Sequence, residues 1–110
     1  MSYSTKELIV QSWIANTPTL VYTSSAGNTI IDKLTTTNTT AGALTVSIYV
    51  LAPAGTATTL TLVKARSLAP DECYTWPEIV GKTIAIGAMI YAGTTAATSV
   101  NIGMSGRVGT

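Results

Sequence analysis

The stretch ALTVSIYVL, residues 43–51, decides the fold class of this chain. Apolar residues alternate with polar or aromatic ones along it, so every second side chain of an extended strand would point the same way. The expected inward residues are Leu44, Val46, Ile48 and Val50, and the expected outward residues are Thr45, Ser47 and Tyr49. Valine, isoleucine, threonine and tyrosine pack well on a pleated surface. The stretch therefore predicts a half-buried β-strand.

The same period of two extends from this stretch in both directions. Residues 98–106, TSVNIGMSG, repeat it, with Val100, Ile102 and Met104 expected inside. Further strands are expected near residues 7–14, 19–24, 29–38, 60–67, 72–76 and 88–93, separated by the residues that turns require. The only helical geometry expected is one turn at residues 77–80. The connections are too short for crossover helices, so the strands should be antiparallel.

Together these features predict one domain, residues 1–110, folded as a β-sandwich. We expect seven to eight antiparallel strands in a jelly-roll or immunoglobulin-like topology. A chain of 110 residues is long enough to build one core without metals or disulfides. Residues 1–18 are interpreted as an N-terminal arm or an edge strand.

The chain carries little charge for its length. Only 10% of its residues are charged, against about a quarter in an ordinary globular domain, and its net charge is +1. Proteins stay apart in solution largely through net charge and charged edges. We therefore expect much of the surface to be covered by other protein. The six scattered Lys and Arg residues form no patch for nucleic acid, which is not an expected partner.

No segment predicts secretion or membrane insertion. Lys6, Glu7 and Gln11 interrupt the apolar character that a signal peptide would need near the N-terminus. A membrane-spanning helix needs roughly 18 consecutive apolar residues, and the sequence contains no such run. A membrane is therefore not an expected partner. The single cysteine, Cys73, fits a protein made in a reducing cytoplasm.

The segment KARSLAPDECYTWPEIVGK, residues 64–82, is the first place to look for an active site. It contains six of the charged side chains, together with the cysteine and one of the two tryptophans. Lys64 and Arg66 are expected to project from one face of a strand. Asp71 and Glu72 are expected at the solvated tip of a hairpin, in a tight turn that Pro70 begins.

This segment nevertheless offers no convincing catalytic group. The chain has no histidine to serve as a base for Cys73. A thiol beside Tyr74 and Trp76 is expected to be a small buried residue rather than a reactive one. Asp71 and Glu72 are adjacent, so on a strand they would point to opposite faces and could not act as an acid and base pair. We do not expect the protein to be an enzyme.

No cofactor or metal site is predicted elsewhere. The acidic residues are scattered and show no ligand spacing. Gly103, Gly106 and Gly109 recur at a spacing of three, but no helix follows them to bind a phosphate. Asp32 and Lys33 interrupt an apolar strand. Either one of them lies inside the sandwich or in an interface, or the strand is an edge strand whose charges oppose aggregation.

The run from Leu44 to Arg107 resembles small structural proteins of tailed bacteriophages and prophages. The resemblance rests on a Thr- and Ala-rich strand region, the segment at residues 64–81, and an ending that runs from Gly87 to Gly106. It implies a non-enzymatic virion protein, assembled in the bacterial host cytoplasm. Such a protein would be a cement or decoration protein that stabilises the head lattice through contacts with the major capsid protein. A small tail, baseplate or fibre component is the alternative.

The expected partner-facing residues lie in two places. Tyr3 and Lys6 belong to the N-terminal segment, which lies outside the resemblance, and Asp71 and Glu72 belong to the expected hairpin tip. Copies of the chain itself are also expected partners. Closed symmetric rings are common among oligomers, and a trimer is the expected state.

A receptor- or carbohydrate-binding module at a tail tip is the other function considered. Trp13, Trp76 and the tyrosines would then be stacking platforms for a ligand. The alternative is that these aromatic residues fill the core. An exposed aromatic patch would favour the binding module.

Overall fold

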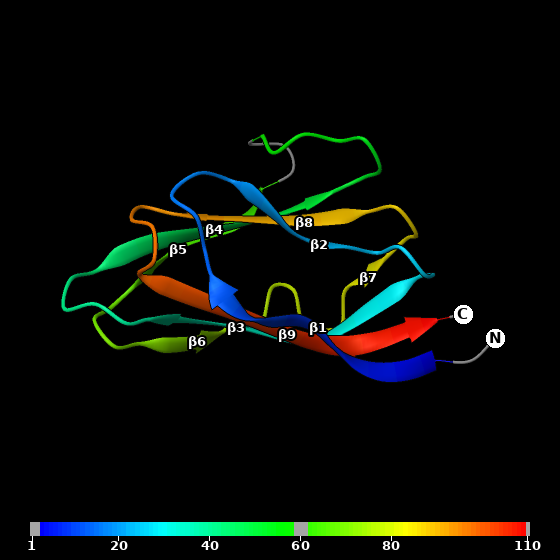
Figure 1. Ribbon diagram of the computed structural model, residues 1–110, viewed down its shortest axis with the longest axis horizontal. Coiled ribbons are helices and arrows are strands. Elements are labelled where there is room, and N and C mark those ends of the chain that lie inside the picture. The colour runs from blue at the N-terminus through cyan, green and yellow to red at the C-terminus, as the bar shows by residue number, and fades with distance from the viewer. Residues whose placement is uncertain (1–2, 59–61, 110) are drawn as a thin grey trace.

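Nine β-strands form most of the described part of the chain, which is residues 3–58 and 62–109 of a computed structural model (Figure 1). The strands are β1 (Tyr3–Trp13), β2 (Thr19–Thr23), β3 (Thr29–Asn38), β4 (Leu44–Leu51), β5 (Leu62–Leu68), β6 (Cys73–Thr75), β7 (Thr83–Ile84), β8 (Met89–Thr94) and β9 (Val100–Gly109). The predicted all-β fold is confirmed, with one strand more than expected. The additional strand, β7, has only two residues, too few to show a period of two in the sequence. Within the described ranges, no helix is long and apolar enough to cross a membrane.

The strands make two antiparallel sheets that pack face to face (Figure 1). Sheet A has the order β1-β9-β3-β6, with β7 also paired to β3, and sheet B has the order β2-β8-β4-β5. If the short β7 is set aside, the first strand pairs with the last, the second with the next to last, and so on inward to the pair of β4 and β5. The chain is thus a long hairpin rolled into two sheets, which is a jelly roll. Of the two expected topologies, the jelly roll is the observed one.

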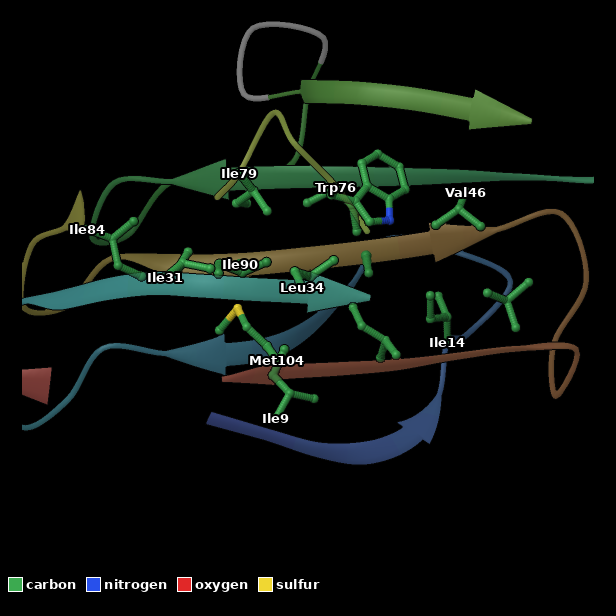
Figure 2. Packing of buried hydrophobic residues seen from close by; sticks show 14 of the residues in the cluster. Ile9, Ile14, Ile31, Leu34, Val46, Trp76, Ile79, Ile84, Ile90 and Met104 are labelled. Carbon is green, nitrogen blue, oxygen red and sulfur yellow. The ribbon is translucent and has the colours of Figure 1, made fainter. Parts of the chain in front are cut away.

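The hydrophobic core lies between the sheets (Figure 2). Ile31 and Leu34 of β3 pack in one cluster with Val46 of β4 and Ile90 of β8, and all four side chains are fully buried. Trp76, from the connection that follows β6, belongs to the same cluster. Side chains from both sheets therefore fill a single core.

The alternation predicted from the sequence is confirmed in β4 and β9. In β9 the expected inward residues Val100, Ile102 and Met104 are all buried. In β4 the expected inward residues Val46 and Ile48 are fully buried, whereas Leu44 and Val50 are half-buried and pack against the core. The residues between them are exposed or half-buried. One face of each strand therefore contributes to the core.

Asp32 and Lys33 lie on the surface of a central strand. The expectations of a position inside the sandwich and of an edge strand are both wrong, and a position in an interface stays a prediction. The pairing of β3 with β9 shifts register between Ile31 and Lys33, and this bulge lets two consecutive side chains reach solvent. Arg107 of β9 donates from Nη2 to Oδ1 of Asp32 at 2.9 Å. Neither charged residue lies inside the sandwich, and β3 is not an edge strand.

The two long edges of the sandwich are built differently. β1 and β2 lie along one edge, and β5 and β6 lie along the other. β1 has two register shifts against β9, one between Glu7 and Ile9 and one between Ile9 and Ser12. Bulges of this kind twist an edge strand and interrupt the row of backbone groups that another strand could pair with. The edge formed by β1 is therefore poorly suited to strand addition.

Asn38, at the end of β3, ties the two sheets together near the β5–β6 edge. Its side chain is fully buried, and Nδ2 donates to the carbonyl of Gly42 at 2.8 Å and to the carbonyl of Leu68 at 3.2 Å. Its Oδ1 accepts a hydrogen bond from the backbone N–H of Thr40 at 3.0 Å. A buried amide with this many partners fixes the connections around it.

Candidate functional site

The charge-rich segment at residues 64–82 closes the edge between β5 and β6. The guanidinium carbon of Arg66, on β5, lies 4.4 Å from the centroid of the Tyr74 ring on β6. Arg66 Nη2 also donates to Oε2 of Glu78 at 3.0 Å. The rings of Tyr74 and Trp76 pack in a T-shaped, edge-to-face arrangement, with their centroids 5.6 Å apart. These contacts join a strand of sheet B to sheet A, which is a structural role.

Trp76 belongs to the core and not to a binding surface. Its side chain is fully buried, and Nε1 donates to Oγ1 of Thr36 at 2.9 Å. A buried indole whose only polar group is satisfied fills volume and is closed to a ligand. Of the two interpretations offered for Trp76, the core position is correct.

Glu78 is held in its charged form. The pKa of Glu78 is lowered mainly by a hydrogen bond from its own backbone N–H. The hydrogen bond and the charge of Arg66 lower this pKa further, whereas partial loss of hydration raises it. A general acid or base works best when its pKa lies near the operating pH. The lowered pKa therefore makes this carboxylate a weak candidate for proton transfer.

Asp71 and Glu72 lie in a tight turn, as predicted, but the turn is not the tip of a hairpin. The backbone N–H of Glu72 donates to the carbonyl of Ala69 at 3.1 Å, so Pro70 and Asp71 occupy the central positions. The strand before the turn pairs with β4 and the strand after it pairs with β3. The turn therefore carries the chain from sheet B to sheet A, because the two strands that flank it pair with strands of different sheets and not with each other.

The two acidic residues of this turn have different surroundings. Asp71 is exposed and has a φ of 60°, a left-handed conformation that aspartate tolerates better than most residues. Glu72 is half-buried, and its Oε1 accepts a hydrogen bond from the backbone N–H of Ala69 at 2.7 Å. Glu72 thus helps to close its own turn.

Cys73 is exposed, so the prediction that it is a small buried residue is wrong. It lies in β6 opposite Thr37 of β3, on the outward side of sheet A. Its neighbours Tyr74 and Trp76 occupy the alternate positions, which point toward Arg66 and the core. The period of two that buries the aromatic residues therefore exposes the thiol.

Tyr3 and Lys6 lie in β1, at the opposite edge from Asp71 and Glu72. Tyr3 is paired with Gly109 and Lys6 with Gly106, both in β9. Lys6 is exposed. The structure thus keeps the two pairs of expected partner-facing residues apart, on two edges of the sandwich.

The outer face of sheet B carries no charged side chain. β2, β4 and β8 contain no Asp, Glu, Lys or Arg, and the charged residues of β5 lie on the side of Arg66, which is directed toward β6. Strand pairing places Leu20, Tyr91 and Tyr49 in one row across this face. Leu20 is 45% exposed, and both tyrosines are half-buried. The face is therefore uncharged, with an apolar and aromatic row across it.

The outer face of sheet A presents Trp13 beside a pair of amide side chains. Trp13 lies opposite Asn101 of β9 and is 52% exposed. Nε2 of Gln11 donates to Oδ1 of Asn101 at 2.6 Å, which links β1 to β9. Directly opposed residues of antiparallel strands share one face of the sheet. The indole and the two amides therefore lie next to one another on this surface.

A shallow hollow of about 210 Å³ continues from the amide pair along the same face. Gly103 forms its floor, and a Cβ atom at that position would lie 2.6 Å from Oε1 of Gln11. The other lining residues come from β1, β3 and β9, and they are Glu7, Ile9, Gln11, Lys33, Thr35, Met104 and Ser105. The side chain of Gln11 lies over Gly103, in the space that a Cβ atom at residue 103 would occupy.

Of the residues at this surface, Trp13 is a binding candidate from the sequence alone, whereas Gln11, Asn101 and Gly103 are not. Asn101 and Gly103 occupy outward positions in the expected strand at residues 98–106, which is a weak signal that they are available at the surface. Their neighbours in β1 follow only from the pairing of the first strand with the last. Local periodicity contains no information about that pairing.

Comparison of the chain with protein-family models, with curated proteins and with solved structures found no match. Within residues 3–58 and 62–109, no group of three or more Cys, Asp or Glu side chains lies close enough to hold a metal ion. The candidate surfaces are therefore the two outer faces of the sandwich.

Proposed function

We propose that this protein is a non-enzymatic structural component of a bacteriophage virion, a cement or decoration protein on the head. The observation that carries the proposal is the charge-free outer face of sheet B, with its row of Leu20, Tyr91 and Tyr49. In the proposed assembly this face lies against the major capsid protein.

Burial of this face in a contact is favourable for two reasons. No charge loses its hydration, and the loss of hydration is the main cost when charged surfaces are buried. Tyrosine is enriched in the centres of protein interfaces, whereas lysine, glutamate and aspartate are depleted there. A protein that binds only the assembled lattice stabilises that lattice by mass action.

The jelly-roll topology supports this proposal by analogy. Viral capsid proteins and lectins both use the architecture. A fold does not by itself specify a function, so the weight of the proposal rests on the uncharged face. The protein would assemble in the bacterial host cytoplasm and would also contact copies of itself, with a trimer as the expected ring.

The first test asks whether the chain is part of a particle. Antibody raised against the recombinant protein is applied to density-gradient fractions of phage particles from the bacterium that encodes it. The protein is expected to sediment with the particles and to be removed only by conditions that dissociate them. Its absence from every particle fraction would overturn the proposal.

The second test asks whether sheet B is the docking face. Ser47 lines a hollow of about 160 Å³ on that face. A lysine at this position therefore has room, and its charge would be placed in the contact. Ser47→Lys is expected to fold normally and to be lost from particles. Thr75→Lys adds the same charge to an exposed position on sheet A and serves as the matched control. Equal particle association of both variants would show that the contact lies elsewhere.

The oligomer is tested in solution by light scattering over a hundredfold dilution. A mass of three times 11.4 kDa that persists on dilution is the expected result. A persistent monomer would remove the trimer from the proposal and leave the contact with the capsid as the only one.

A second candidate function is a small tail, baseplate or fibre component that binds a receptor or a carbohydrate. The specific observation in its favour is the half-exposed indole of Trp13 on the outer face of sheet A. Trp76 does not contribute, because it is buried.

A further inference from the structure

We infer that the outer face of sheet A binds a neutral saccharide across β1 and β9. Trp13 is the stacking platform, and the hollow above Gly103 holds the neighbouring sugar unit. This inference deepens the second candidate function. It does not depend on where sheet B docks, because it uses the opposite face of the sandwich.

The platform is the indole of Trp13. It is 52% exposed at an outward position of β1, although its large apolar rings would be stabilised by burial. One face of a sugar ring carries mostly C–H groups, and an aromatic ring can cover that face without removing hydroxyl groups from water. The position opposite Asn101 places the indole beside side chains that can form hydrogen bonds.

The amide pair provides directional contacts next to that platform. The hydrogen bond from Gln11 to Asn101 fixes both side chains. It leaves Oε1 of Gln11 and the Nδ2 group of Asn101 without another partner among the described residues. One is an acceptor and the other is a donor of two hydrogen bonds. An acceptor and a donor held side by side match the adjacent hydroxyl groups of a sugar, each of which can both donate and accept.

The hollow provides the second subsite. Its volume of about 210 Å³ is below the 300–1,000 Å³ typical of drug-sized ligands, so it suits a single small ring. Gln11 and Trp13 are two residues apart on the strand, which corresponds to roughly 7 Å. That distance is comparable with the width of one sugar ring. A saccharide chain would therefore run along β1 and β9, with one ring on the indole and the next in the hollow.

The charges around the hollow indicate a neutral ligand. Glu7 and Lys33 flank Ser105 at the far end and have opposite signs. Neither forms an ion pair with another described residue. A carboxylate and an ammonium group on either side of β9 give the hollow no net charge and so no net attraction for an anion such as a sulfated sugar, but both groups can bind hydroxyls.

The test is amide NMR on the isotope-labelled full chain during titration with maltotriose, cellotriose, chitotriose and lactose. At least one of these neutral saccharides is expected to shift the indole N–H of Trp13 and the side-chain amides of Gln11 and Asn101. The indole N–H of Trp76 serves as an internal control and should not move, because it is buried and bonded to Thr36. A heparin-derived oligosaccharide serves as the anionic comparison and should bind more weakly.

Variants then assign the binding to the proposed groups. Trp13→Ala is expected to weaken binding by roughly tenfold or more, as truncation of a central aromatic contact does elsewhere. Trp13→Phe keeps an aromatic ring and should retain part of the affinity. Gly103→Ala should weaken binding by displacing the side chain of Gln11, because the new Cβ atom would lie 2.6 Å from Oε1 of that residue. Ile86→Ala is the matched control, because it truncates an apolar side chain that is 58% exposed in the connection between β7 and β8, and it should bind as the unmodified chain does.

Three results would overturn the inference. They are no shift with any of the four saccharides, equal affinity of Trp13→Ala and the unmodified chain, and shifts confined to Tyr49 and Tyr91. The two proposed functions fail separately. Loss of saccharide binding with retained particle association removes only the saccharide site. Saccharide binding by a chain that is absent from particles removes the head and the tail location together and leaves the saccharide site standing.

Discussion

The two tryptophans stand at opposite edges of the sandwich and have opposite roles. Trp76, beside the β5–β6 edge, is fully buried and hydrogen-bonded to Thr36, and it packs against Tyr74 beneath Arg66. Trp13, on the β1–β2 edge, is half-exposed next to the Gln11–Asn101 pair. The segment rich in charge and aromatic residues is thus structural, whereas the plainer strand β1 presents its indole to solvent. A segment rich in charged and aromatic residues can therefore hold the edges of two sheets together instead of forming a functional site.

The strongest way to break this comparison is to truncate both tryptophans. Trp76→Ala should lower the free energy of unfolding by about 3–5 kcal/mol, because it leaves a cavity in the core. Trp13→Ala is the matched control and should change the same quantity by less than about 0.5 kcal/mol. Urea denaturation followed by circular dichroism measures both. Similar losses of unfolding free energy for the two variants would contradict the view that the β5–β6 edge is closed by buried side chains and the β1–β2 edge is not.

The two asparagines allow the same comparison with a smaller effect. Asn38→Ala should cost about 1–3 kcal/mol, because the backbone groups that its amide satisfies lose their partners inside the fold. Asn101→Ala removes only the surface bond to Gln11 and should cost less. Thermal unfolding of the two variants side by side is the measurement. If Asn101→Ala were the more destabilising change, the β1–β9 surface would be structural.

The charge of Glu78, at the β5–β6 edge, should make the stability of the protein depend on pH. The pKa of Glu78 is lowered in the folded protein, mainly by the hydrogen bond from its own backbone N–H and further by Arg66. The charged carboxylate therefore contributes stability above the ordinary glutamate pKa. That contribution is lost as the pH falls through the lowered pKa. Glu78→Gln should therefore flatten the acid side of a plot of urea midpoint against pH. An unchanged acid limb would mean that Glu78 does not stabilise the folded state through its charge.

The smallest expected effect on stability is that of a substitution in β1, at the β1–β2 edge. Val10 is 68% exposed at the bulge of β1, and replacement by threonine should change stability by less than about 0.5 kcal/mol. Differential scanning calorimetry is sensitive enough to detect a larger change. A clear loss would indicate that Val10 is covered in solution, for example by a second copy of the chain.

The sequence predicts the strands of this fold well, because inward residues such as Val46 and Ile102 recur at a period of two. It also locates the turn with Pro70 and Asp71 at its centre. Strand partners are not predictable in the same way. The strands on either side of that turn look like a hairpin but pair with β3 and β4, because pairing depends on the rolled topology and not on proximity in the sequence.

The orientation of Trp13 shows why a surface site is harder to predict than a strand. Ile9 is buried, and a strict period of two would place Trp13, four residues later, on the same inner side. The bulge between Ile9 and Ser12 shifts the strand by one residue, so Ser12 takes the side of Ile102 and Trp13 faces outward. No turn residue marks the bulge in the sequence. A single inserted residue therefore decides whether the indole fills the core or faces solvent.

The position of β9 has a consequence for the timing of folding. β9 lies between β1 and β3 in sheet A, so neither of these earlier strands has its full set of backbone partners until residues 100–109 have left the ribosome. Folds dominated by pairings between strands far apart in the sequence form slowly, and their strands stay exposed and unpaired until the partner strand has been made. A chain released before β9 would lack the centre of one sheet. Folding of this domain is thus expected to follow synthesis of β9, and a chain terminated before β9 should be a substrate for chaperones or proteases.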